Sequence, residues 1–151
     1  MCKVHGITYA SREFQRRVKP ITETANKSGL FDTFKCFTED DIDVNFKVEY
    51  SEVWNMRQRG GGYWIWKPYI IKQALSSISK SSKDIIVYID SGCHINITSE
   101  SQKRFSQYVD MVGNASSGFL RFRLIHKEVN FTNKKTVDYF QKKFNIRDDI
   151  M

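Results

Sequence analysis

The sequence predicts an α/β domain with a mostly parallel β-sheet and helices on both faces. The strongest indication is residues 85–89, an unbroken run of mainly β-branched side chains between turn formers, which is typical of a strand buried on both faces. A second indication is that two kinds of segment alternate along the chain. In one kind every second residue is apolar, and in the other an apolar residue recurs about every 3.6 positions. Strands joined by crossover helices produce this alternation, which predicts a Rossmann-like sheet.

The first half of the chain supplies two strands and two helices. Residues 3–10 and 33–37 are short alternating segments that we interpret as strands. The helix between them has Pro20 inside its pattern, where a kink or a restart is expected, and Gly29 at its end. Acids at residues 39–43 then begin an amphipathic helix that extends to Trp54, and we favour helix capping over a metal site for these acids.

The second half continues the alternation. A helix over residues 68–78 begins at its proline, and a helix capped by Thr98 or Ser99 follows the central strand. Residues 119–125 alternate apolar and basic side chains, which predicts a fourth strand. Thr132 is then expected to cap a last helix.

Polar side chains follow each predicted strand. Thr8 and Tyr9 end the first strand, Glu39 follows the second, Asp90 the third and His126 the fourth. On its own, Asp90 is equally well explained as the start of a turn. Because the carboxyl ends of parallel strands meet at one edge of a sheet, where open α/β folds bind ligands, the convergence favours a ligand site.

A segment with three consecutive glycines is the most unusual part of the chain. If residues 63–67 are extended, Trp64 and Trp66 point to the same side, and we expect at least one of them to anchor the core. Arg59 and Lys67 bracket the glycines and are the expected contacts to a phosphate group. The segment lacks the Gly-Lys-Ser/Thr ending of a Walker loop.

The net charge of +7 (24 Lys and Arg against 17 Asp and Glu) indicates an anionic partner such as a nucleotide diphosphate, anionic lipid or nucleic acid. Nucleic acid is disfavoured, because the basic residues are spread along the chain and the densest group falls on one predicted helix face. The three cysteines lack CxxC spacing, which predicts reduced thiols. Without a signal peptide or an apolar run of membrane-spanning length, a cytoplasmic protein with no membrane span is expected.

Two motifs together resemble a known family. The segment Gly-Tyr-Trp-Ile-Trp-Lys-Pro at residues 62–68 precedes a strand that ends Tyr-Ile-Asp-Ser-Gly at residues 88–92. This pair is similar to bacterial and viral putative glycosyltransferases with the GT-A (nucleotide-diphospho-sugar transferase) fold. The opening residues 7–10, the turn at residues 29–32 and the segment at residues 126–132 also look similar, so the likeness covers nearly the whole chain.

The resemblance implies a nucleotide-sugar donor bound at the carboxyl edge of the sheet. Carried over by position, Thr8 and Tyr9 flank the nucleobase, and Arg59 and Lys67 face the diphosphate. Asp90 takes the place of the Asp-x-Asp acid that holds a divalent cation, Mn²⁺ or Mg²⁺, against the phosphates. The further expected contacts to the nucleotide sugar are Ala10, Gly62, Tyr63, Trp66, Ser91 and Gly92.

The chain departs from the family pattern at the metal. Gly92 replaces the second acid of Asp-x-Asp, whereas hard cations prefer several oxygen ligands. Either the cation is weakly held by Asp90 with help from His94, or it is absent and Arg59 and Lys67 substitute for it.

The predicted function is transfer of a sugar from a nucleotide diphosphate to a glycan or polysaccharide acceptor. Asp90, His126 and Glu128 are the candidate catalytic residues. We expect residues 1–151 to form one donor-binding domain, which is a short version of the family, a fragment, or a donor-binding half whose acceptor site a partner chain completes. The alternatives are a non-catalytic relative that binds nucleotide sugar or acts as an interaction module, and a basic nucleic-acid-binding domain.

Overall fold

The computed structural model describes residues 2–55, 57, 59–78, 83–122, 125 and 130–145. The chain divides into two compact units, Met1–Gly118 and Phe119–Met151. The first unit contains all the strands of the described residues and most of the helices. The second contains α6 (Lys134–Phe144) among its described residues.

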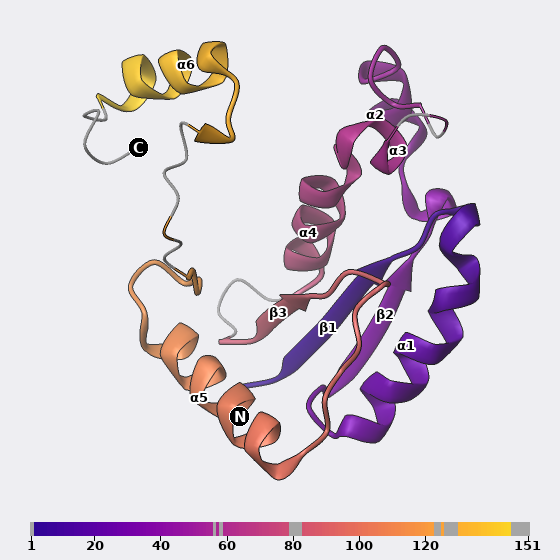
Figure 1. The fold of residues 1–151 in the computed structure, drawn as a ribbon, viewed down its shortest axis with the longest axis vertical. Helices are drawn as coiled ribbons and strands as arrows, with labels where there is room; N and C mark the ends of the chain where they lie inside the picture. Colours follow the sequence, from indigo (N-terminus) through magenta and orange to yellow (C-terminus); the bar gives the residue numbers. More distant parts are fainter. Residues whose placement is uncertain are drawn as a thin grey trace. The chain divides into compact units, whose positions relative to one another are not determined.

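The first unit is built on an open parallel sheet of three strands in the order β2-β1-β3 (Figure 1). These are β1 (Val4–Tyr9), β2 (Thr33–Phe37) and β3 (Ile85–Tyr88). In the central strand β1, Ile7 pairs with Tyr88 of β3. The α/β class and the parallel pairing predicted from the sequence are confirmed.

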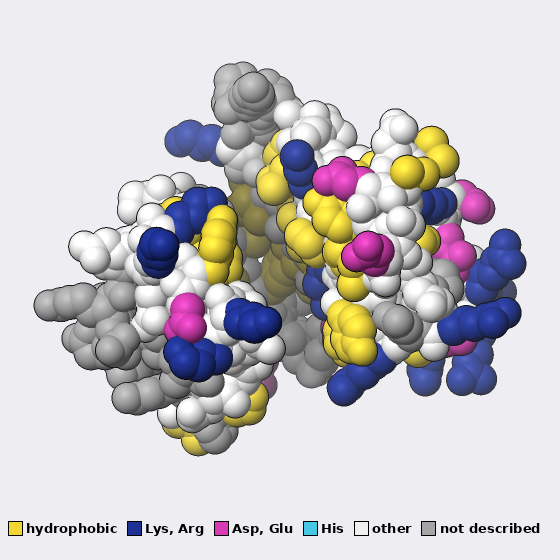
Figure 2. Space-filling view, turned by 90° about the horizontal axis from the view of Figure 1, so that it is seen from above, with side chains coloured by type: hydrophobic (Ala, Val, Ile, Leu, Met, Phe, Trp, Pro, Cys, Tyr) yellow, Lys and Arg dark blue, Asp and Glu magenta, His cyan; other side chains and the backbone are white. Residues whose placement is uncertain are grey.

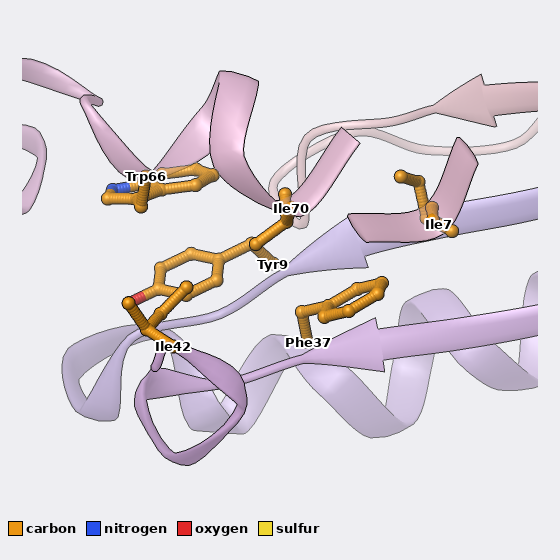
Figure 3. Packing of buried hydrophobic residues seen from close by; sticks show 7 residues of the cluster. Ile7, Tyr9, Phe37, Ile42, Trp66 and Ile70 are labelled. Carbon is orange, nitrogen blue, oxygen red and sulfur yellow. The ribbon is translucent and has the colours of Figure 1, made fainter. Parts of the chain in front are cut away.

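Two apolar clusters cover opposite faces of this sheet, because neighbouring residues of a strand point to opposite sides. On one face Ile7, Tyr9 and Phe37 pack with Trp66 and Ile70 of α4 (Trp66–Ser77). The six labelled residues of Figure 3 belong to this cluster.

On the other face, Ile21 and Ala25 of α1 (Gln15–Ser28) pack with Ile95, Phe34 and Ile89. The helix α5 (Ser99–Asn114) contacts β3. Helices therefore lie on both faces of the sheet, as the sequence predicts.

Several helix ends form where the sequence places them. Gly29 follows α1 with φ of +65°, a left-handed conformation that glycine adopts without steric cost. Thr98 caps α5 by accepting a hydrogen bond from the Ser101 backbone N–H at 3.3 Å. Pro20 lies inside α1 without ending it, and the Thr24 hydroxyl donates to the Pro20 carbonyl at 2.8 Å.

The acids after β2 cap helices. Asp41 accepts from the Thr38 backbone N–H at 2.8 Å and starts the 3₁₀ helix η2 (Glu39–Asp41). Asp43 accepts from the Asn45 N–H at 2.7 Å and caps α2 (Val44–Glu49). The capping interpretation is confirmed.

The predicted length of the helix that follows was wrong. We expected helix as far as Trp54, but α2 ends at Glu49 and turns follow it. The aromatic spacing that suggested a longer helix belongs to a compact ring cluster, in which Phe46 lies 4.7 Å from Tyr50 and 6.1 Å from Trp54 between ring centroids.

The predicted fourth strand is not present in the described part of residues 119–125. Residues 119–122 and 125 have no strand conformation, and Phe119, Phe122 and Ile125 are all more than half exposed. Alternation alone does not form a strand, since a strand needs a hydrogen-bonded neighbour. The cap of α6 also differs, because Asn133 rather than Thr132 accepts from the Lys135 N–H at 2.9 Å.

No helix within the described residues has both the length and the apolar character needed to cross a membrane.

Candidate functional site

The glycine-rich segment forms a left-handed turn. All five residues from Gly60 to Trp64 have positive φ angles, between 55° and 92°. Two backbone bonds close it, from Tyr63 N–H to the Arg59 carbonyl at 2.8 Å and from Trp64 N–H to the Gly60 carbonyl at 3.1 Å. Left-handed backbone costs about 1–2 kcal/mol for each residue other than glycine. The three glycines of α3 (Gly60–Tyr63) therefore lower the conformational energy of this turn.

The extended conformation of residues 63–67, on which our prediction of side-chain directions depended, is therefore not present, since Tyr63 and Trp64 have positive φ and α4 (Trp66–Ser77) begins at Trp66. The alternation of side chains in that prediction ignored the preference of three successive glycines for positive φ. A Cβ atom on Gly62 would also collide with the carbonyl oxygen of Val53, so this glycine is needed for packing within the protein. Gly62 is buried and does not line the pocket described below.

The end of β1 is joined to this turn through Trp66. The Trp66 ring stacks on Tyr9 with centroids 3.9 Å apart and an interplanar angle of 21° (Figure 3). Its indole Nε1–H donates to the Gly60 carbonyl at 2.8 Å. Trp66 is thus a core anchor, as we expected for at least one of the tryptophans.

The side chains of Thr8 and Ala10 are fully enclosed, with 0% and 1% of each residue exposed. Tyr9 is also buried, and burial, followed by the charge of Glu39, raises the pKa of its hydroxyl. Of these three expected contacts to the nucleotide sugar, only Tyr9 lines the pocket described below.

Asp90 is held at the carboxyl end of β3 by two donors. The Tyr88 hydroxyl donates to Asp90 Oδ1 at 2.6 Å, and Lys67 Nζ lies 3.1 Å from the same oxygen. The Lys67 ammonium also lies 4.8 Å from the centre of the Tyr88 ring. Within the described part of the chain, no hydrogen bond reaches Oδ2 of Asp90.

These contacts fix the charge of Asp90. The hydrogen bond from Tyr88 and the attraction of Lys67 lower the pKa of the Asp90 carboxyl, against partial burial, which raises it. The pKa of the Tyr88 hydroxyl is raised by burial and by its bond to Asp90. At neutral pH the site therefore presents an ionised carboxylate, 59% exposed, with Oδ2 available to a ligand.

A pocket of about 210 Å³ lies at the carboxyl ends of β1 and β3. Its walls come from the end of β1 and the 3₁₀ helix η1 (Arg12–Phe14), from the glycine turn with the start of α4, and from β3 with the turn after it. The lining residues are Tyr9, Ser11, Glu13, Phe14, Gly60, Gly61, Trp64, Trp66, Tyr88, Asp90, Ser91 and Gly92.

The two expected phosphate contacts lie beside this pocket and do not line it. Lys67 is paired with Asp90, and the Arg59 guanidinium lies 5.4 Å from the centre of the Trp64 ring. Because Asp90 and Trp64 are lining residues, each cation is one residue away from the pocket. Elsewhere, Lys and Arg side chains are spread over the face shown in Figure 2, with Asp and Glu among them.

The other predicted site residues divide into three groups. Ser91 and Gly92 line the pocket with Asp90, whereas Tyr63 and His94 are exposed and do not line it. The described residues contain no group of three His, Cys, Asp or Glu side chains that could hold a metal ion. His126 and Glu128 lie outside the described residues.

Our sequence analysis missed several lining residues, chiefly Tyr88, Trp64, Glu13 and Phe14. Tyr88 had a usable signal, because residues two apart in a strand share a face, and the Tyr-x-Asp spacing therefore predicts that Tyr88 lies beside Asp90. Trp64 was considered only as a core anchor, but it is 41% exposed. Glu13 and Phe14 had no comparable signal, because their positions depend on how η1 leaves β1.

Comparison with known proteins gives no relative: no protein-family model, curated protein or solved structure matches this chain.

Proposed function

We propose that this chain binds a nucleotide-sugar donor at the carboxyl edge of its sheet and acts as a glycosyltransferase. The observation that carries the proposal is the pocket between β1 and β3, which contains an ionised Asp90 paired with Lys67. Open α/β sheets bind ligands at this edge. The motif resemblance supports the same donor class.

In this proposal the protein chiefly stabilises the charge that develops on the leaving diphosphate. Arg59 and Lys67 supply positive charge beside the pocket, and Asp90 orients the donor through its free oxygen. A base that activates the acceptor belongs to the proposal, with His126 and Glu128 as candidates.

The side chains at the pocket are a poor set of ligands for a divalent cation. Hard cations prefer several oxygen ligands, whereas Asp90 is the only member of the expected metal site that lines the pocket. Its Oδ1 is already contacted by an ammonium group at 3.1 Å. The described side chains therefore do not form a divalent-cation site by themselves, and we assign no step to the metal.

Titration of the full chain with UDP- and GDP-sugars, with and without Mn²⁺, tests the proposal. Calorimetry should detect binding of at least one donor, and the Asp90→Asn variant should weaken it by about tenfold or more, because a charged hydrogen-bonding partner is lost. Asp40→Asn is the matched control, since Asp40 is an exposed acid outside the pocket. If no nucleotide sugar binds even weakly, the proposal fails.

One observation favours the second candidate, a non-catalytic relative. The described sheet has three strands, and the expected fourth strand is not formed in the described part of residues 119–125. This candidate predicts donor binding without transfer to any glycan and without donor hydrolysis. Product analysis after incubation with radiolabelled donor separates the two candidates.

A further inference from the structure

The pocket carries chemistry that does not suit a phosphate group. Among its lining residues in the described part of the chain, two, Glu13 and Asp90, are acids, and none is Lys or Arg. The Lys67 ammonium is paired with Asp90, and the Arg59 guanidinium lies over Trp64. A diphosphate placed inside would face carboxylates, and like charges repel.

The same pocket has aromatic surface from two separate elements. Trp64 of the glycine turn is 41% exposed and Phe14 of η1 is 50% exposed, although both are large apolar side chains. The glycine turn holds Trp64 in place, since Gly60 packs so closely against its ring that a Cβ there would lie 2.5 Å from a ring carbon. The ring is thus presented to solvent by an ordered backbone.

The volume of the pocket limits the size of the ligand that it can enclose. Its volume of about 210 Å³ is below the roughly 300–1,000 Å³ typical of pockets that enclose a drug-sized ligand. One ring fits, whereas a whole nucleotide sugar does not. The acids and the Ser11 hydroxyl are acceptors for the N–H or O–H groups of such a ring.

From these observations we propose that the pocket binds one uncharged ring of the donor through Trp64 and Phe14, while the diphosphate stays outside, beside Arg59 and Lys67. The ring has an apolar face and hydrogen-bond donors on its edge, which describes both a nucleobase and a pyranose. This inference rests on the proposed function, because it assigns a part of the donor to a part of the site. It adds Trp64 and Phe14 as ring-binding residues.

Nuclear magnetic resonance of the three tryptophan indole N–H groups tests the inference in the full chain. The Trp64 signal is identified by its loss in the Trp64→Phe variant. Wild-type protein is titrated with uridine, guanosine, methyl glycosides and inorganic pyrophosphate. A nucleoside or a glycoside should shift the Trp64 signal, and the class that does so identifies the ring, whereas pyrophosphate should leave this signal in place.

Variants then test the aromatic contact. Trp64→Leu and Phe14→Leu should each weaken ring binding by about tenfold, the upper range for an aromatic contact, while Trp64→Phe should retain most of it. Leu75→Ala is the control, because Leu75 is 51% exposed on α4 and lies outside the pocket. Since Trp64 and Phe14 come from different elements, a folding defect in one variant leaves the other informative.

The outcomes separate this inference from the proposed function. The inference is overturned if pyrophosphate alone shifts the Trp64 signal, or if ring binding is equal in wild type and both leucine variants. If nucleotide sugars bind wild type and both leucine variants with equal affinity, the inference fails and the proposed function stands. If free rings bind and depend on Trp64 but no nucleotide sugar binds, the proposed function fails and the ring pocket stands.

Discussion

The glycine turn before α4 and the turn after β3 both place glycine beside the pocket, but for different reasons. In the first, Gly60, Gly61 and Gly62 all have positive φ, and a Cβ on Gly62 would collide with the Val53 carbonyl. In the second, Gly92 has no positive φ, and a Cβ there would meet nothing within 4 Å. The glycine turn needs glycine for its backbone conformation, whereas the turn after β3 has open space where a Cβ of residue 92 would lie.

This difference separates two roles that a glycine beside a ligand site can have. The glycine turn is hydrogen-bonded to the core residue Trp66, and its Trp64 lines the pocket. The turn after β3 is open, and its polar side chain Asp90 is more than half exposed. We therefore expect changes in the glycine turn to lower stability, and changes around Asp90 to affect binding more than stability.

The largest effect is expected from Gly62→Ala. Alanine at a φ of +92° adds about 1–2 kcal/mol of backbone strain, and displacement of the Val53 backbone adds to this cost. Urea unfolding should show a loss of at least ~2 kcal/mol in the free energy of unfolding. Gly92→Ala is the matched control and should change it by less than ~0.5 kcal/mol. Equal effects in the two variants would remove the distinction between the turns.

Trp66→Phe is expected to have the next largest effect. Phenylalanine keeps a ring against Tyr9 but cannot donate to the Gly60 carbonyl, which then loses a hydrogen bond at a partly buried position. The Gly60 carbonyl still accepts from the Trp64 N–H at 3.1 Å, so the expected cost is that of one hydrogen bond, about 0.5–1.5 kcal/mol. Urea unfolding gives the free energy, and the Trp64 indole signal should broaden or move if the turn loosens. An unchanged free energy would mean that the turn is held by its glycines alone.

The sequence predicted the elements whose signals are local. The strand at residues 85–89, the Gly29 helix end and the Thr98 cap depend on neighbouring residues, and each lies in or near its predicted place. The predictions of helix over residues 50–54 and of strand over residues 119–122 were wrong, because the periodicity of apolar residues does not show which part of the protein covers them. Tyr50 and Trp54 lie after the end of α2 and pack against Phe46 within it, and Phe119 and Phe122 remain exposed.

The part of the site that the sequence predicted also depends on local signals. Asp90 and Lys67 meet because one follows β3 and the other begins α4, which packs beside that strand. Arg59 could not be placed from the sequence, because a left-handed turn separates it from Lys67 and the alternation of an extended segment does not apply there. Phe14 and Glu13 join the pocket through the path of η1, which no local pattern encodes.

The smallest effect on stability is expected at Asp90. Its pKa is lowered in the folded protein, so its contribution to stability is present above the unfolded value of about 3.9 and is lost as the pH falls through the folded pKa. Because 59% of the side chain is exposed, solvent screens the pair with Lys67, and about 0.5 kcal/mol or less is expected. Urea midpoints of wild type and Asp90→Asn should differ slightly at pH 6, and the difference should shrink as the pH falls below the unfolded value of about 3.9. A large difference at pH 6 would make Asp90 part of the structural support, and the contrast between the two turns would no longer hold.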